Sequence, residues 1–198
     1  SAGKIEYIKT AANIARALSE KREEIVDLCL STPEANSLGM SMLIKKENSL
    51  GIALNKIIQG DARKVIVLEN DLYRRAPHSE VAKALAKAES VMVIDQLPSK
   101  TTEQATLLLP ATAFSEHEAT YVNYEGRAQV SFQVHQNKNG ARPAWRWLSE
   151  NQKESISSLT NRLTQSSECF RGITELRPEI SGTVSGMQVP RQSHRHSG

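Results

Sequence analysis

Polar side chains able to recognise a nucleotide or a pterin follow a strongly apolar run of the chain. Glu69, Asn70 and Asp71 come directly after the run Val65–Leu68. In open α/β sheets, ligands bind beyond the carboxyl ends of the strands, where polar loops converge. The amide and carboxylates could hydrogen-bond a base or pterin edge, and an arginine at 74–75 could bind a phosphate. Alternatively, Asn70 and Asp71 shape the turn through side-chain-to-backbone hydrogen bonds, and we favour this interpretation.

A second polar segment places Asn123, Glu125 and Arg127 at alternate positions, with Gly126 between the last two and Gln129 beyond them. In an extended chain these alternate side chains share one side, and the glycine permits a tight turn. The segment could therefore bind a pyranopterin nucleotide. It could also form an internal Glu–Arg pair that pins the loop, which the residues by themselves favour.

Several familiar motifs are missing from the sequence. No G-x-G-x-x-G follows an apolar run and no G-x-x-x-x-G-K-[ST] occurs, so nothing predicts NAD or ATP binding. Glu116–Glu118, with His117 between the two acids, could suggest a metal site. Adjacent side chains diverge, however, and we predict a surface loop. Cys29 and Cys169 are isolated, which favours reduced thiols and excludes a four-thiolate iron–sulfur cluster.

The composition restricts the class of protein. The 198 residues suffice for one domain with a core. The net charge of +3 is spread over interleaved acids and bases, so we expect no nucleic-acid partner. No apolar run approaches the roughly 20 residues that cross a bilayer, so we expect no direct membrane insertion. Neither end of the sequence carries an initiator Met, a signal peptide or another terminal signal, and we expect an excised part of a longer protein.

Hydrophobic periodicity predicts alternating helices and strands. Helical spacing predicts helices over 4–24, 50–58 and 81–88, the second ending at Gly60. Continuous apolar runs predict buried strands at 25–30, 65–68, 91–94 and 106–109. The fold class is therefore α/β, a doubly wound and mainly parallel sheet of about four or more strands with helices on both faces. We expect an α/β domain over 4–135, a helical segment over 143–172 and an irregular tail over 173–198.

Long segments resemble the molybdopterin oxidoreductases, and within them the large iron–sulfur subunits of bacterial NADH-quinone oxidoreductases. The resemblance is carried by Val65–Tyr73, Thr106–Phe114, Ser115–Gln129 and Ala144–Leu148. Where many members have Asp-Gly-Thr, this chain has Glu118–Thr120, and Tyr124 stands where Thr is common. Alanine in place of that glycine restricts the backbone at a point where a cofactor would approach.

The resemblance implies a Rossmann-like domain of the molybdopterin oxidoreductase fold. It implies a structural domain of respiratory complex I whose parent subunit carries iron–sulfur clusters elsewhere, with molybdopterin unlikely. The implied partners are other peripheral-arm subunits and the remainder of the same subunit, on the cytoplasmic side of the inner membrane. The alternative is a cofactor-binding domain of an active molybdenum enzyme. In the structural domain, the polar residues of both segments are expected to form a vestigial pocket: Glu69, Asn70, Asp71, Asn123, Glu125, Gly126, Arg127 and Gln129.

Overall fold

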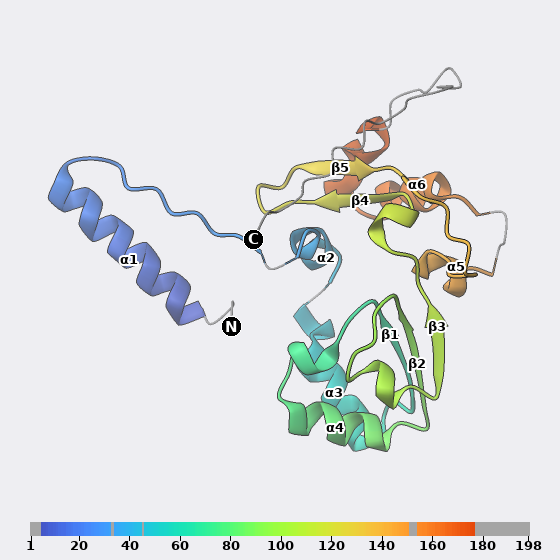
Figure 1. Ribbon diagram of the computed structural model, residues 1–198. Coiled ribbons are helices and arrows are strands. Elements are labelled where there is room, and N and C mark those ends of the chain that lie inside the picture. The colour runs from blue at the N-terminus through green and yellow to red at the C-terminus, as the bar shows by residue number, and fades with distance from the viewer. Residues whose placement is uncertain (1–4, 33, 45, 151–153, 177–198) are drawn as a thin grey trace, which may run out of the picture.

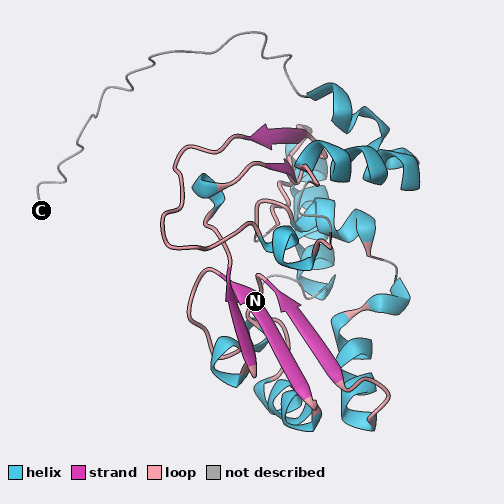
Figure 2. Cartoon of the chain, turned by 90° about the vertical axis from the view of Figure 1, so that its right-hand side faces the viewer, coloured by secondary structure: helices cyan, strands magenta, loops and turns pink. Residues whose placement is uncertain are grey.

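A parallel sheet and an antiparallel hairpin form the body of the chain. The computed structural model describes residues 5–32, 34–44, 46–150 and 154–176. The sheet contains β1 (Lys64–Leu68), β2 (Ser90–Asp95) and β3 (Leu107–Pro110) in the order β1-β2-β3. The hairpin of β4 (Ala119–Val122) and β5 (Ala128–Ser131) lies beyond the carboxyl ends of these strands (Figures 1 and 2). Most of the predicted tail, 177–198, lies outside the described residues.

One face of the parallel sheet packs against two helices, α3 (Leu50–Gln59) and α4 (His78–Lys87). Val67 pairs in register with Val93, and both side chains are buried in the main core together with Leu54 and Val81. The predicted strands 65–68, 91–94 and 106–109 are confirmed, as are both helices. Gly60 ends α3 in the left-handed conformation, with φ 86°, which glycine adopts without a steric penalty.

The other face of the sheet is only partly covered. Ile94, fully buried, packs with Ala111 and with Ala144 of the short helix α5 (Ala144–Leu148). Near β1 the side chains stay open, and Ile66 is 56% exposed. The prediction of helices on both faces therefore holds only over the part of the sheet that α5 reaches, because the other helices of the body pack elsewhere.

The predicted strand at 25–30 is wrong. Ile25 is 90% exposed and the segment has no regular secondary structure. It follows α1 (Ile5–Arg22), a helix that buries no residue and lies apart from the body (Figure 1). A strand needs a partner for its backbone groups, and among the described residues none pairs with this run. The apolar character of this run is therefore not sufficient to make it a strand.

The helical region after the hairpin is divided. Over the segment 143–172, which we expected to be helical, the structure has α5, α6 (Ile156–Ser166) and most of a 3₁₀ helix, η5 (Glu168–Leu176). Ser155 caps α6 by accepting a hydrogen bond from the Ser158 amide at 3.1 Å. The remaining elements are α2 (Ser37–Leu43) and the 3₁₀ turns η1 (Lys46–Asn48), η2 (Leu72–Arg74), η3 (Thr102–Gln104) and η4 (Phe114–Glu116). Within the part of the chain that the structure describes, no helix has both the length and the apolar character needed to cross a membrane.

Candidate functional site: the carboxyl rim of the parallel sheet

The end of β1 carries backbone strain at a carboxylate. Glu69 has φ 46°, in the left-handed region that side chains other than Gly, Asn and Asp seldom adopt. Its amide still donates to the Ile94 carbonyl at 2.8 Å, which continues the β1–β2 ladder. Burial raises the pKa of the Glu69 carboxyl; nearby His117 opposes that shift and Asp95 adds to it. Strain together with a partly desolvated acid is a combination found at functional sites, and also where a tight turn is over-determined by its surroundings.

Asp71 shapes the turn that follows. Its carboxylate accepts the Thr101 hydroxyl at 2.8 Å and the Tyr73 amide at 3.3 Å. Thr101, fully buried, in turn accepts the Leu72 amide at 2.9 Å. The carboxylate therefore caps η2 and ties it to the β2–β3 connection, 30 positions away along the chain. This geometry agrees with the turn-shaping interpretation of Asp71.

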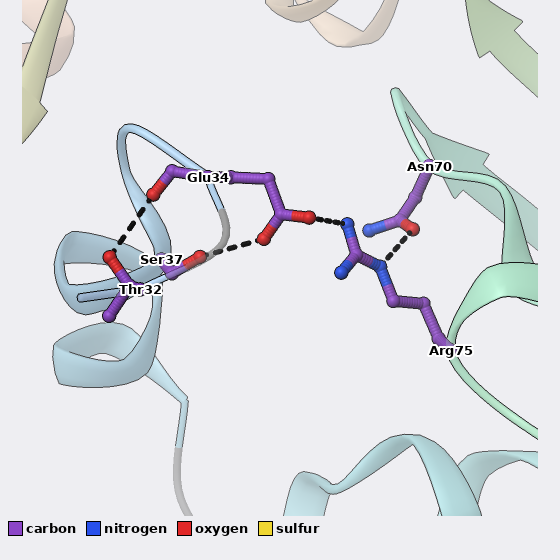
Figure 3. A network of polar contacts seen from close by, with 5 residues as sticks. All are labelled: Thr32, Glu34, Ser37, Asn70 and Arg75. Atoms are coloured by element: carbon purple, nitrogen blue, oxygen red, sulfur yellow. Dashed lines mark hydrogen bonds and ion pairs between the residues drawn. The ribbon is translucent and has the colours of Figure 1, made fainter. Parts of the chain in front are cut away.

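Asn70 and Arg75 belong to a polar network that leads away from the sheet (Figure 3). Arg75 donates through Nε to the Asn70 side-chain oxygen at 3.1 Å, and its terminal nitrogen pairs with the Glu34 carboxylate. The second oxygen of Glu34 accepts the Ser37 hydroxyl at 2.8 Å. Hydrogen bonds from Arg75 and then Ser37 lower the pKa of the Glu34 carboxyl. The guanidinium is thus matched by a carboxylate, which weakens its candidacy as a phosphate ligand.

The second polar segment forms the turn of the β4–β5 hairpin. The Asn123 side-chain oxygen accepts the Glu125 amide at 3.0 Å and the Arg127 amide at 2.9 Å, while Gly126 takes φ 80°. Among the described residues, Glu125 and Arg127 form no ion pair with each other. The turn is held by the side-chain oxygen of Asn123 in place of the Glu–Arg pair that the sequence suggested. Gln129 lies exposed on β5, opposite Tyr121.

These two groups of predicted residues are not bonded to each other. Across the described chain, no hydrogen bond or ion pair joins Glu69–Asp71 to Asn123–Gln129. The hairpin residue whose pKa responds to the charge of Glu69 is instead Tyr121, on β4. Burial raises the pKa of the Tyr121 hydroxyl, and the Glu69 carboxylate adds to the shift.

A cavity of about 590 Å³ opens beside this rim. Its wall includes His117, whose Nδ1 lies 3.0 Å from the hydroxyl of buried Thr112. Glu116 accepts the Ala113 amide at 3.0 Å and the Asn137 side-chain amide at 3.1 Å. The Arg146 guanidinium lies 4.1 Å from the centre of the Trp145 ring. The cavity is therefore a polar pocket with an aromatic side.

Sequence reasoning missed this pocket, and none of the predicted pocket residues lines it. Glu116–Glu118 were assigned to a surface loop because neighbouring side chains diverge. In the structure all three are half-buried and line this one pocket. The wall is completed by residues from a returning loop and from α5: Gln133, Gln136, Asn137, Trp145 and Arg146. The sequence does show many amide and charged side chains over 116–118 and 133–137, and these could have suggested a polar pocket. No local motif, however, indicates that the two segments lie side by side.

The comparisons with known proteins decide the family. Residues 2–151 match the family described as Molybdopterin oxidoreductase. The chain belongs to the molybdopterin oxidoreductase family. It is similar to the G subunit of the NADH-quinone oxidoreductase of Shewanella oneidensis, at 35% identity over 212 residues and 100% of this chain. The corresponding protein of Pseudomonas putida is 37% identical over 205 residues, or 96% of this chain, and that of Escherichia coli K12 is 34% identical over 212 residues.

This chain is much shorter than these relatives. It spans 23% of the length of the Shewanella and Escherichia proteins and 22% of the Pseudomonas protein. The family match and the parallel sheet together confirm the predicted family and the α/β fold class, although the described sheet has three strands.

The polar groups that follow β1 do not fit a pterin dinucleotide. Such a cofactor carries a pyrophosphate, which proteins bind with arginines or with amides at helix N-termini. Here Arg75 is engaged by Glu34, and the pocket wall combines the acids Glu116 and Glu118 with Arg146. Within the described ranges, no group of three or more His, Cys, Asp or Glu side chains could hold a metal ion.

Proposed function

We propose that this chain is a structural domain of the large iron–sulfur (G) subunit of a respiratory NADH-quinone oxidoreductase. In that role it supports electron transfer from NADH to quinone without holding a redox centre itself. The observation that carries the proposal is the match of 96–100% of the chain to the G subunits of several bacteria, over less than a quarter of each of them. The iron–sulfur clusters of the parent subunit then lie in other parts of it.

The assignment of partners follows from the same proposal. The domain packs against the remainder of its own subunit and, through it, against other subunits of the peripheral arm of complex I. This arm lies on the cytoplasmic side of the bacterial inner membrane. We therefore expect the side chains of the rim to serve folding and docking.

The polar contacts at the rim support a structural role. Asp71 with Thr101, Arg75 with Glu34 and Asn123 with its own turn each satisfy backbone or charged groups inside the fold. Groups committed in this way hold loops in place, and a ligand that displaced Asp71 would leave the buried Thr101 hydroxyl without its acceptor. We therefore interpret the residues of the vestigial pocket proposed from the sequence as side chains whose polar contacts hold these loops in place.

A matched pair of glycine variants in the complete subunit tests the structural role. A methyl group added at Gly39 meets the Asn36 side-chain oxygen at 2.3 Å, whereas one added at Gly51 meets nothing within 4 Å. In bacterial membranes, we expect Gly39→Ala to lower the amount of assembled complex while NADH-dependent quinone reduction per assembled complex stays unchanged. Gly51→Ala should change neither quantity. A fall in turnover at normal assembly would contradict a purely structural role.

A spectroscopic and calorimetric test addresses the cofactor. We expect the purified chain, reduced with dithionite, to give no stoichiometric electron paramagnetic resonance signal, because two isolated cysteines are all the thiols it has. Titration with a guanine-containing pterin nucleotide should release no binding heat. Tight binding that disappears in Arg127→Ala would instead favour a cofactor-binding domain of an active molybdenum enzyme.

A further inference from the structure

The second face of the parallel sheet is an uncovered apolar surface. Ile66 and Leu68 of β1 are 56% and 46% exposed, and Leu107 of β3 is 45% exposed. Parallel sheets occur almost only with both faces covered, because their crossovers lay helices over them. On the opposite face of the same strands, Val67 and Val93 are 5% and 0% exposed. The contrast between the two faces is greatest at β1.

The topology explains why this chain leaves that face open. The path moves steadily from β1 to β2 to β3, and both connections pack on the face that carries α3 and α4. Tyr73, after β1, and Ala105, before β3, both join that core. Since crossovers between parallel strands are right-handed, a chain advancing in one direction keeps them on one face. Beyond the part that α5 reaches, helices that cover the other face as crossovers must belong to connections that run the opposite way, outward from β1.

The outer edge of β1 is also unpaired among the described strands. The Glu69 amide donates to Ile94 of β2, and peptide directions alternate along a strand. The amides of Ile66 and Leu68 therefore point away from β2, toward the free edge. An edge with free donors beside an apolar face is a template for another strand.

We propose that a strand–helix unit of the same subunit, from outside these 198 residues, completes this sheet. Its strand pairs in parallel with the outer edge of β1, and its helix packs an aliphatic face on Ile66, Leu68 and Leu107. The relatives support this occupant because this chain accounts for 22–23% of their length, which leaves most of each protein to supply it. α5 already covers the face at Ile94, so the missing cover lies over Ile66 and Leu68 of β1 and over Leu107 of β3. The inference rests on the proposed membership in a longer subunit.

Thiol labelling at a single position tests the proposal. The two native thiols are exposed, so both are first replaced in a Cys29→Ser, Cys169→Ser background. Ile66→Cys places a probe on the open face, and Lys83→Cys places a control on the exposed side of α4. The rates at which the thiols introduced at positions 66 and 83 react with N-ethylmaleimide are measured on the peptides that carry them, in the 198-residue chain and in the complete subunit, so that other thiols of the subunit do not contribute. We expect the ratio of the two rates, probe over control, to fall at least about tenfold in the complete subunit, because covered sites react only after local opening.

Each other outcome overturns the proposal. An unchanged ratio means that nothing in the complete subunit covers the face. Protection already present in the 198-residue chain would assign the face to α1 if it is independent of concentration, and to a second copy if it grows with concentration. Amide exchange in the protein without cysteine substitutions provides a second measurement: exchange at Ile66 and Leu68 should slow in the complete subunit, and unchanged exchange refutes strand pairing. Neither readout depends on a cofactor, so pterin binding would overturn the proposed function without affecting this result.

Discussion

Replacing Gly39 by alanine should destabilise the body of the chain through one close contact. Gly39 is the buried residue of α2, and a methyl group there would lie 2.3 Å from the Asn36 side-chain oxygen and 3.2 Å from Cβ of Val122. The first distance is far below any van der Waals contact, so Asn36 must move. That oxygen accepts the Val122 amide at 2.8 Å, which is the bond that ties α2 to β4.

The magnitude follows from what the displacement leaves behind. Val122 is 5% exposed, and a buried amide without its partner costs about 1–3 kcal/mol. Alanine is favoured over glycine inside a helix by up to about 1 kcal/mol, which offsets part of the cost. We therefore expect Gly39→Ala to lower the free energy of unfolding by about 1–3 kcal/mol once crowding against Val122 is included. Gly51→Ala, with open space around it, should be neutral or stabilising by up to about 1 kcal/mol.

Denaturant unfolding followed by the fluorescence of Trp145 and Trp147 measures both variants. A double-mutant cycle with Asn36→Ala isolates the contact, because the clash partner is then absent and most of the added cost of Gly39→Ala should disappear. Equal stabilities for the Gly39 and Gly51 variants, or an undiminished cost in the Asn36→Ala background, would refute the reasoning.

Three further predictions test the electrostatics, with five substitutions between them. Burial raises the pKa of Glu69, so the folded state favours its protonated form and stability declines as pH rises from about pH 4.5 through the raised value. Glu69→Gln should reduce that decline, measured by thermal unfolding. Glu80→Gln, at an exposed position of α4, should leave the decline in place. Arg75 lowers the pKa of Glu34, so their pair stabilises the fold above about pH 4.5 and is lost as pH falls through the lowered value. Because both side chains are about a third or more exposed, Arg75→Ala should cost less than about 1 kcal/mol at neutral pH in denaturant unfolding, and roughly 0.5 M salt should weaken the pair in the unsubstituted chain. Glu154 is 9% exposed; it pairs with Arg162 at 2.6 Å and accepts the Ser149 hydroxyl at 2.7 Å. Arg162→Ala removes the charged partner and leaves the hydroxyl, so it should destabilise by about 1–3 kcal/mol, and Glu154→Gln in the same chain should restore part of the loss. A loss unchanged by that second substitution would show that Arg162 acts through packing.

The sequence by itself determined the elements whose pattern is local. Continuous β-branched runs placed β1 and β2, because a strand of a parallel sheet is apolar on both sides. Helical spacing from Leu50 to Ile58 placed α3, and Gly60 marked its end, because only a few residues decide a helix stop. Gly126 as a turn residue followed for the same reason, since its positive φ is a local requirement.

Tertiary structure decided which polar groups meet. Asn36 bonds to Val122 across 86 positions, and Arg75 pairs with Glu34 across 41, and no local pattern announces either partner. The apolar run at 25–30 resembles a strand as closely as 91–94 does, but only the second found neighbours for its backbone groups. The pocket beside His117 likewise exists because a returning loop and α5 close it. Local pattern fixes the period and direction of side chains, whereas the pairing of distant segments depends on the burial and hydrogen bonding of the chain as a whole.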